Sequence, residues 1–218
     1  MADTQDMEYP GKDKSPTAGI VLAAGMSARF GPLKPLFKVG NGTILSMVID
    51  AAVKSDLDRI VLVLGYQSDE IIADIVHQFH DPRLRTVINP LYRDGMSGSI
   101  QRGLLEIMDE FLSVMIIMGD HPLLDSDTIN MLLDRFRASD RDICVPVYKG
   151  TRGLPVCFGK RFFPDIMGIT GDIGAREIIR KNPEHVLAVE LENPDCFLDV
   201  DNKGDVATLL SRFEKKKV

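Results

Sequence analysis

A short segment near the start of the chain combines small residues with one arginine and one lysine. It reads Leu22-Ala23-Ala24-Gly25-Met26-Ser27-Ala28-Arg29-Phe30-Gly31-Pro32-Leu33-Lys34 and follows the apolar run 19–22. Glycine and alanine let backbone N–H groups approach phosphate oxygens, while the arginine and lysine supply positive charge. The spacing is neither that of a Walker A loop nor the G-x-G-x-x-G pattern of dinucleotide-binding loops. The segment therefore predicts a loop around a triphosphate; the alternative is an ordinary glycine turn with solvated basic residues.

Two carboxylates stand where a divalent cation could use them. Asp120 directly follows the apolar run 114–118, and open parallel sheets bind ligands at the carboxyl ends of their strands. Mg²⁺ prefers one or two carboxylates together with phosphate oxygens and water. Alternation places Asp199 and Asp201 on one face of an extended segment, so either could complete the site. A capping role remains open for Asp120, which precedes a turn, and for Asp201, which precedes the last helix.

A third polar segment, 89–100, joins the end of a strand to the start of a helix. It contains Asn89 and Gly95, followed by Ser97 and Ser99 near the predicted N-cap. Amide and hydroxyl groups can read the edge of a nucleotide base, because an incorrect base leaves buried polar groups unpaired. An ordinary capped loop would have the same composition.

The elements that must position these residues alternate along the chain. Apolar strands are predicted at 19–22, 59–64, 84–88, 113–118 and 186–191, and helices at 44–53, 71–79, 97–111, 127–136, 173–180 and 204–213. Two extended runs, 143–148 and 154–158, form either a hairpin or a longer crossover. Continuous apolar strands between helices favour a Rossmann-like, three-layer α/β/α fold with a mostly parallel sheet and a small antiparallel addition. We expect a polar, flexible tail at 1–16, one domain over 17–213 and a charged tail at 214–218.

Composition limits the classes of function. The chain has 218 residues, a net charge of −6 and 44% apolar residues, with no apolar run long enough to span a bilayer. The acidic balance argues against a nucleic-acid partner, which needs a basic face. No signal peptide is recognisable in the polar N-terminal residues, so a cytoplasmic protein without a membrane partner is expected. The three cysteines lack C-x-x-C spacing and are expected to be buried, reduced thiols.

The order of these motifs resembles that of the molybdenum cofactor cytidylyltransferases, within the wider family of molybdopterin-type nucleotidyltransferases. The resemblance runs from about Ala18 to Leu210. It is carried by the 22–34 segment, the stretch Asn89-Pro90-x-Tyr92-x-x-Gly95-Met96-Ser97, Gly119-Asp120-x-Pro122-Leu123, Val200-Asp201 and Gly171-Asp172-Ile173-Gly174-Ala175-Arg176. Related guanylyltransferases tend to have Ala-Gly-Gly where this chain has Ala23-Ala24-Gly25. This difference favours cytosine as the base of the nucleotide substrate. The fold implied is that of the nucleotide-diphospho-sugar transferases.

The resemblance implies a reaction as well as a fold. A terminal phosphate of a phosphorylated pterin would attack the α-phosphorus of CTP and release pyrophosphate, with Mg²⁺ or Mn²⁺ held by Asp120 and Asp201. Arg29, Lys34 and Asp120 would be catalytic. Nucleotide contacts would come from Leu22, Ala23, Ala24, Gly25, Arg29, Lys34, Gly65, Asn89, Gly95, Ser97 and Ser99. Acceptor contacts would come from Arg152, Gly171, Asp172, Gly174 and Arg176. A molybdoenzyme that receives the cofactor would be a partner.

Departures from the family pattern leave the acceptor open. Where branch members have R-G-H-P, this chain has Arg152-Gly153-Leu154-Pro155, and His121 replaces the usual Gln or Met after the metal aspartate. Phe30 stands in a Met position, and Gly98 replaces a serine. The alternatives left open are a sugar or polyol phosphate acceptor, a GTP-using guanylyltransferase, and a non-catalytic module that delivers the cofactor. A nicotinamide or flavin oxidoreductase is disfavoured because the dinucleotide motif is missing.

Overall fold

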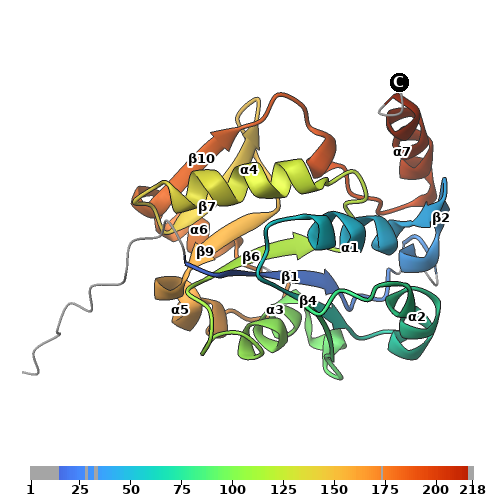
Figure 1. The fold of residues 1–218 in the computed structure, drawn as a ribbon, viewed down its shortest axis with the longest axis horizontal. Helices are drawn as coiled ribbons and strands as arrows, with labels where there is room; N and C mark the ends of the chain where they lie inside the picture. Colours follow the sequence, from blue (N-terminus) through green and yellow to red (C-terminus); the bar gives the residue numbers. More distant parts are fainter. Residues whose placement is uncertain (1–14, 28, 32–33, 173, 216–218) are drawn as a thin grey trace, which may run out of the picture.

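The computed structural model describes residues 15–27, 29–31, 34–172 and 174–215, which build a central eight-stranded sheet (Figure 1). The strand order is β10-β7-β9-β6-β1-β4-β5, with β8 paired to β7. The strands are β1 (Thr17–Ala23), β4 (Arg59–Leu64), β5 (Leu84–Ile88), β6 (Ser113–Met118), β7 (Ile143–Tyr148), β8 (Thr151–Arg152), β9 (Val156–Gly159) and β10 (Val186–Glu190). A separate ribbon pairs β2 (Lys38–Val39) with β3 (Gly42–Thr43).

The strand directions confirm the predicted mostly parallel sheet. β1 runs parallel to both β4 and β6, β4 runs parallel to β5, and β7 runs parallel to β10. β9 is antiparallel to β6 and β7, and β8 is antiparallel to β7. The choice left open for 143–158 is thereby resolved. Lys149 and Gly150, both with positive φ, turn a β7–β8 hairpin, and the next strand inserts between β6 and β7.

Helices cover both faces of the sheet because each strand alternates its apolar side chains between them. On one face, Val21, Leu62 and Ile117 pack with residues of α1, α2 and α4. On the other face, Ile20 and Val63 pack with residues of α3, α5 and α6. The helices are α1 (Ile44–Lys54), α2 (Ser68–Asp74), α3 (Met96–Leu105), α4 (Ser126–Arg137), α5 (Phe163–Met167), α6 (Arg176–Lys181) and α7 (Lys203–Lys215). α7 lies beside the β2–β3 ribbon (Figure 1).

Several predicted helix boundaries are wrong. The helix expected at 71–79 is α2 followed by a 3₁₀ turn at Val76–Gln78. The helix expected at 97–111 ends at Leu105, because i→i+3 bonds such as that from Ile107 N–H to the Leu104 carbonyl tighten the chain there. α6 begins at Arg176, and residue 173 lies outside the described part. α7 reaches Lys215, so residues 214–215 of the predicted tail are helical, while 1–14 and 216–218 are not described.

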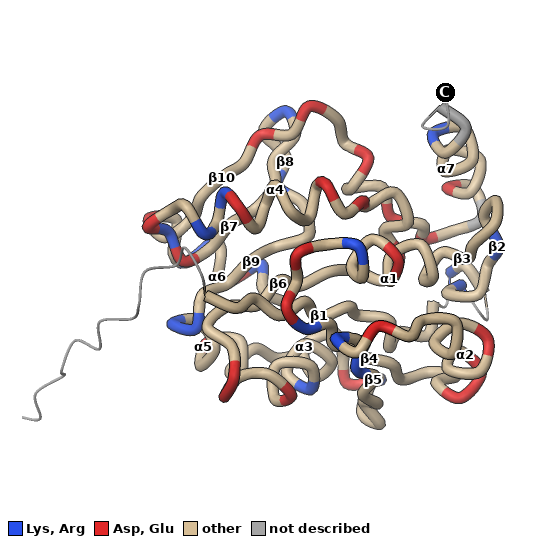
Figure 2. Tube along the Cα trace, viewed as in Figure 1, with Lys and Arg blue, Asp and Glu red and all other residues tan. Residues whose placement is uncertain are grey.

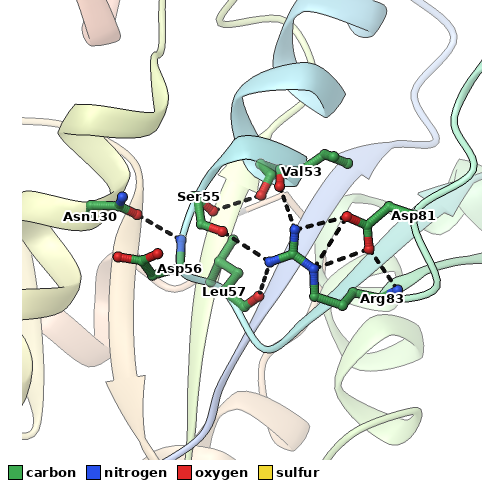
Figure 3. A network of polar contacts seen from close by, with 8 residues as sticks. Val53, Ser55, Asp56, Leu57, Asp81, Arg83 and Asn130 are labelled. Carbon is green, nitrogen blue, oxygen red and sulfur yellow. Dashed lines mark hydrogen bonds and ion pairs between the residues drawn. The ribbon is translucent and has the colours of Figure 1, made fainter.

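Arg83, just before β5, joins Asp81 to the end of α1 and the loop that follows it (Figure 3). Its Nη1 donates to the carbonyls of Ser55 (3.0 Å) and Leu57 (2.7 Å), and its Nη2 donates to that of Val53. Asp81 accepts from Nε at 3.0 Å and from Nη2 at 2.8 Å. One guanidinium therefore satisfies carbonyls at a helix C-terminus that would otherwise lack partners. Sequence inspection does not find this arrangement, because Arg83 and its carbonyl acceptors lie 26–30 residues apart.

Replacing Arg83 by methionine should lower the free energy of unfolding by about 2 kcal/mol, the scale of charge-assisted hydrogen bonds to buried acceptors. For a chain of this size the melting temperature should fall by roughly 4–8 °C. Thermal unfolding followed by circular dichroism measures the change. Arg85→Met is the matched control, because Arg85 is exposed two residues further along β5. Equal melting temperatures for the two variants would contradict the role given to Arg83.

The same pair predicts a pH dependence. Hydrogen bonds from the Arg83 side chain and backbone lower the pKa of Asp81. A carboxyl with a lower pKa in the folded state contributes stability above its unfolded pKa of about 3.9, and that contribution is lost as pH falls through the folded pKa. The difference in melting temperature between the wild type and Asp81→Asn should therefore be larger at pH 7 than at pH 3. A constant difference over this range would contradict the expectation.

The distribution of charge, the character of the helices and the burial of the cysteines agree with what the composition predicts. Lys and Arg are interspersed with Asp and Glu over the described trace (Figure 2). Among the described residues, none of the helices combines the length and the apolar character needed to cross a bilayer. Cys144, Cys157 and Cys196 are buried, and no disulfide joins them within the described part of the chain. Burial of the three thiols matches the expectation.

Candidate nucleotide-binding site

A cavity of about 320 Å³ opens where β1 and β6 end and α3 begins. Its wall includes Leu22, Ala23, Ala24, Gly25, Lys34, Gly95, Ser99, Asp120 and Asp172. The Gly119 N–H donates to the Leu22 carbonyl at 2.9 Å, which brings the ends of the two strands together. A Cβ at Gly119 would lie 2.8 Å from that carbonyl oxygen, so the close approach requires glycine. Segments 22–25 and 118–120 therefore share one crevice, at the sheet edge expected from the sequence.

Four charged side chains form a cluster of which Lys34 and Asp120 line the cavity, while Asp201 and Arg29 lie next to them outside its wall. Lys34 Nζ lies 2.7 Å from Asp120 Oδ2 and 3.6 Å from Asp201 Oδ1, and Arg29 Nη2 lies 3.0 Å from Asp201 Oδ2. The exposed fraction rises outward, from 8% for the Lys34 side chain through 21% for Asp120 and 36% for Asp201 to 79% for Arg29. The sequence separates these residues by up to 172 positions, yet the fold brings all four together. The buried ammonium holds two carboxylates near each other.

A small hydrophobic cluster positions the loops that carry this charge. Its buried members are Phe30, Val39, Ile44, Leu123, Val200 and Leu209. Phe30 follows Arg29 and packs edge-on against Phe37, with ring centroids 5.2 Å apart. Val200 precedes Asp201, and Leu123 belongs to the turn after Asp120. Packing of these apolar neighbours therefore fixes the backbone from which each charged side chain extends. The cluster could not be predicted from the sequence, because its members come singly from loops, from β2 and from the helices α1 and α7.

Asp201 was predicted to be either the N-cap of the last helix or a metal ligand. Its carboxylate faces Arg29 and Lys34 rather than α7. Asp205 in the first turn of α7 instead accepts from the backbone N–H groups of Asp201 (2.8 Å) and Asn202 (2.9 Å), and these bonds lower the pKa of Asp205. Val200 is buried between the exposed Asp199 and the partly exposed Asp201, a pattern that agrees with the predicted alternation. Of the two aspartates, Asp201 is the one that contacts Arg29 and Lys34.

The donor set suits a hard divalent cation. Two carboxylates face one another across Lys34, and carboxylate oxygens are the protein ligands that Mg²⁺ and Mn²⁺ take. Asp120 Oδ1 is buried and has no hydrogen-bond partner among the described residues, so this oxygen keeps its capacity for a ligand. No group of three or more His, Cys, Asp or Glu side chains gathers as a metal site in the described part of the chain. Phosphate oxygens and water would have to complete the coordination.

Some of the predicted nucleotide-contact residues line the cavity and others do not. Gly95 and Ser99 line the cavity, whereas Asn89, Ser97 and Gly65 do not belong to its wall. Asn89 Nδ2 donates to Ser99 Oγ at 3.0 Å, and its Oδ1 accepts from the Leu91 N–H at 3.0 Å. Ser97 Oγ donates to the Gly171 carbonyl at 2.6 Å. Asn89 and Ser97 thus already have structural partners, and their contact with a base stays a prediction.

The predicted acceptor segment meets the start of α3. Asp172 Oδ1 accepts from the Met96 N–H at 3.1 Å, and the Gly171 carbonyl accepts from the Ser97 N–H at 3.0 Å. Gly95, the N-cap, has φ +110° and no side chain, and a Cβ there would lie 2.6 Å from the Gly171 carbonyl carbon. Distant residues therefore cap α3, and Asp172 lines the cavity as a result.

The predicted acceptor residues Arg152, Gly174 and Arg176 lie outside the cavity wall. Arg152 on β8 and Arg176 at the start of α6 are exposed and are not among the residues of the cavity wall. Gly174 has φ +58° and lies beside Met96. Tyr92 and Arg93 line the cavity although the sequence analysis gave neither a role. Both residues belong to the 89–100 segment, which was predicted to contact the nucleotide, so their place at the cavity could have been predicted as well.

Comparisons with known proteins cover most of the chain. Residues 19–186 match the family described as the MobA-like NTP transferase domain. The molybdenum cofactor cytidylyltransferase of Escherichia coli K12 is 26% identical over 197 residues, which are 89% of this chain and 95% of that protein. A probable molybdenum cofactor guanylyltransferase of Thermococcus kodakarensis is 30% identical, over 59% of this chain and 58% of its own length.

Solved structures agree with this assignment. The Rv0371c homolog from Mycobacterium sp. strain JC1 is 25% identical, superposes with a TM-score of 0.79, and is covered over 97% of its length by 91% of this chain. Rv0371c of Mycobacterium tuberculosis H37Rv, solved in complex with manganese, is 25% identical with a TM-score of 0.72, over 90% of this chain and 99% of that one. The chain therefore belongs to the family of MobA-like NTP transferase domains and is a nucleotidyltransferase of that family.

Proposed function

We propose that this protein transfers CMP from CTP to the terminal phosphate of molybdopterin or molybdenum cofactor and releases pyrophosphate. The observation that carries the proposal is the Lys34–Asp120–Asp201 cluster, whose Lys34 and Asp120 line a cavity together with the small residues 22–25. The match to the cytidylyltransferase of Escherichia coli extends over 95% of that protein, so it is not restricted to the nucleotide-binding half. This length of the match supports the cytidylyl assignment.

The chain's own residues divide the work by position. Backbone N–H groups of 22–25 would approach the phosphates, while Lys34 and the more exposed Arg29 would offset the charge of the β- and γ-phosphates. Asp120 and Asp201 would hold Mg²⁺ or Mn²⁺, which supplies charge that polarises the α-phosphate. A phosphate nucleophile is already anionic at neutral pH, so no residue is needed as a strong general base. Catalysis then rests on positioning and charge neutralisation.

A guanylyl activity is the second candidate, because the relative from Thermococcus kodakarensis is named a guanylyltransferase and is 30% identical over the part it shares. Because the Ala23-Ala24-Gly25 segment favours cytosine by its resemblance, we expect kcat/KM for CTP to exceed that for GTP by at least about 100-fold. A site that hydrogen-bonds one base leaves groups unpaired with another. Steady-state kinetics with each nucleotide at a fixed acceptor concentration measure the ratio. A ratio of one or below would assign the guanylyl activity instead.

The acceptor gives a separate prediction. Asp172→Ala should raise KM for the acceptor several-fold and leave the Kd of CTP within about twofold, because it removes a cavity-lining side chain of the predicted acceptor segment. Arg176→Ala and Arg152→Ala test whether these exposed guanidiniums take part in acceptor binding. Should Asp172→Ala weaken CTP and spare the acceptor, the acceptor side of the site has been assigned to the wrong segment.

Identification of the product tests the proposed reaction itself. Mass spectrometry of a reaction containing CTP, Mg²⁺ and molybdenum cofactor should show the acceptor with one added CMP unit. A parallel reaction with sugar or polyol phosphates tests the alternative acceptors that the Arg152-Gly153-Leu154-Pro155 segment leaves open. CTP binding with an unmodified acceptor in every reaction would instead support a delivery module. A molybdoenzyme partner remains part of the proposal.

A further inference from the structure

His121 is a buried histidine directly after Asp120, and the nucleotidyl transfer described above does not use it. Its Nδ1 lies 2.8 Å from the carbonyl oxygen of Cys196. A carbonyl oxygen only accepts hydrogen bonds, so Nδ1 carries the hydrogen in this contact. The ring therefore joins the turn after β6 to a segment 75 residues further along the chain.

A second hydrogen bond joins the same two segments. The Val200 N–H donates to the Asp120 carbonyl at 3.2 Å. The turn that carries Asp120 is thus held at Cys196 and at Val200, and Asp201 follows Val200 directly. Because the His121 ring and the Asp120 backbone both contact this segment, the relative position of the two carboxylates depends on both links.

The His121 ring also limits the orientation of the Asp120 carboxylate. Its Nε2 lies 3.8 Å from Asp120 Oδ1, the oxygen that lacks a hydrogen-bond partner. The other oxygen, Oδ2, contacts Lys34 Nζ at 2.7 Å. The carboxylate therefore lies between an imidazole and an ammonium, and the imidazole is in turn held by a backbone carbonyl. Partners of this kind typically tune metal affinity about 10- to 100-fold without touching the ion.

We propose that His121 is a positioning residue, which fixes the separation and orientation of Asp120 and Asp201 for a divalent cation by anchoring the 120–122 turn to the 196–200 segment. The inference rests on the proposed function, because that function requires the cation. It places no bond between His121 and the ion or the nucleotide. Its consequence is that His121 governs metal affinity more than nucleotide affinity.

Mn²⁺ binding followed by electron paramagnetic resonance tests this directly, alone and with CTP but without acceptor. His121→Leu, which fills space and donates nothing, should weaken Mn²⁺ binding about tenfold or more, while metal-free CTP binding stays within about twofold. His121→Gln, whose amide can still donate to the Cys196 carbonyl, should recover most of the affinity. His80→Gln is the control, because His80 is exposed away from the cavity wall. If His121→Leu does not fold, His121→Asn, with its shorter amide, replaces it.

The outcomes separate the two proposals. Equal Mn²⁺ affinity for wild type, His121→Leu and His80→Gln would overturn the role of His121, as would equal losses of Mn²⁺ and CTP affinity. Failure of the wild-type protein to transfer any nucleotide would overturn the proposed function, while the Mn²⁺ comparison among variants would still decide His121. Absence of Mn²⁺ binding by the wild type under both conditions would overturn both.

Discussion

Asp120→Asn is expected to lower nucleotide turnover at least about 100-fold, which is the scale of losing one key electrostatic contact in an active site. The physical reason is that Asp120 offers the cavity a carboxylate with one buried oxygen free of hydrogen bonds, and an amide cannot replace its charge. Turnover measured against Mg²⁺ concentration should show activity that requires the cation. The fold should persist, since the Asp120 carbonyl, not its side chain, bonds to Val200.

Two further substitutions make this experiment specific. Asp140→Asn changes a fully exposed carboxylate and should leave turnover unchanged. Asp201→Asn should lower turnover and Asp199→Asn should not, because only Asp201 contacts Lys34 and Arg29. Full activity of Asp120→Asn in the presence of EDTA would contradict the metal site.

Lys34→Ala is expected to weaken CTP binding by about 10- to 100-fold, since charge-assisted hydrogen bonds contribute roughly 1.5–3 kcal/mol. Removal of the ammonium also leaves Asp120 and Asp201 facing a polyanion without a compensating charge. Calorimetry with CTP, CMP and cytidine should show the largest loss for CTP and the smallest for cytidine. Arg29→Ala should have the same pattern with a smaller loss, because its side chain is 79% exposed.

The matched control for Lys34 is Lys38→Ala, which removes an exposed lysine from β2 four residues further along. Equal losses for CTP, CMP and cytidine would assign Lys34 to packing or to the base rather than to the phosphates. Equal behaviour of the Lys34 and Lys38 variants would remove Lys34 from the site.

The sequence predicts the sheet and the meeting of its loops because both follow from local patterns. Apolar runs such as 113–118 are bounded clearly, and parallel strands must end at the same edge, so the convergence of Lys34 with Asp120 could be anticipated. The ends of the helices were predicted less accurately than the strands, because tightened turns such as that after Leu105 depend on packing rather than on periodicity.

What escaped sequence reasoning consists of contacts between distant residues. Capping of α3 by Gly171 and Asp172, the three carbonyls held by Arg83, and the bond from His121 to Cys196 each join segments far apart in the chain. Their residue types have many possible partners, so only the fold selects one. Arg152, placed at the acceptor by the family resemblance, lies on β8 outside the cavity wall, and its contact with the acceptor stays a prediction.

Pyrophosphate release, measured with each of the four nucleoside triphosphates in Mg²⁺ and with or without molybdenum cofactor, tests the central claim most directly. We expect release with CTP only when the cofactor is present, and loss of that release in the Asp120→Asn variant. Release with CTP that does not need the cofactor, or no release with any nucleotide under these conditions, would contradict nucleotidyl transfer to this acceptor.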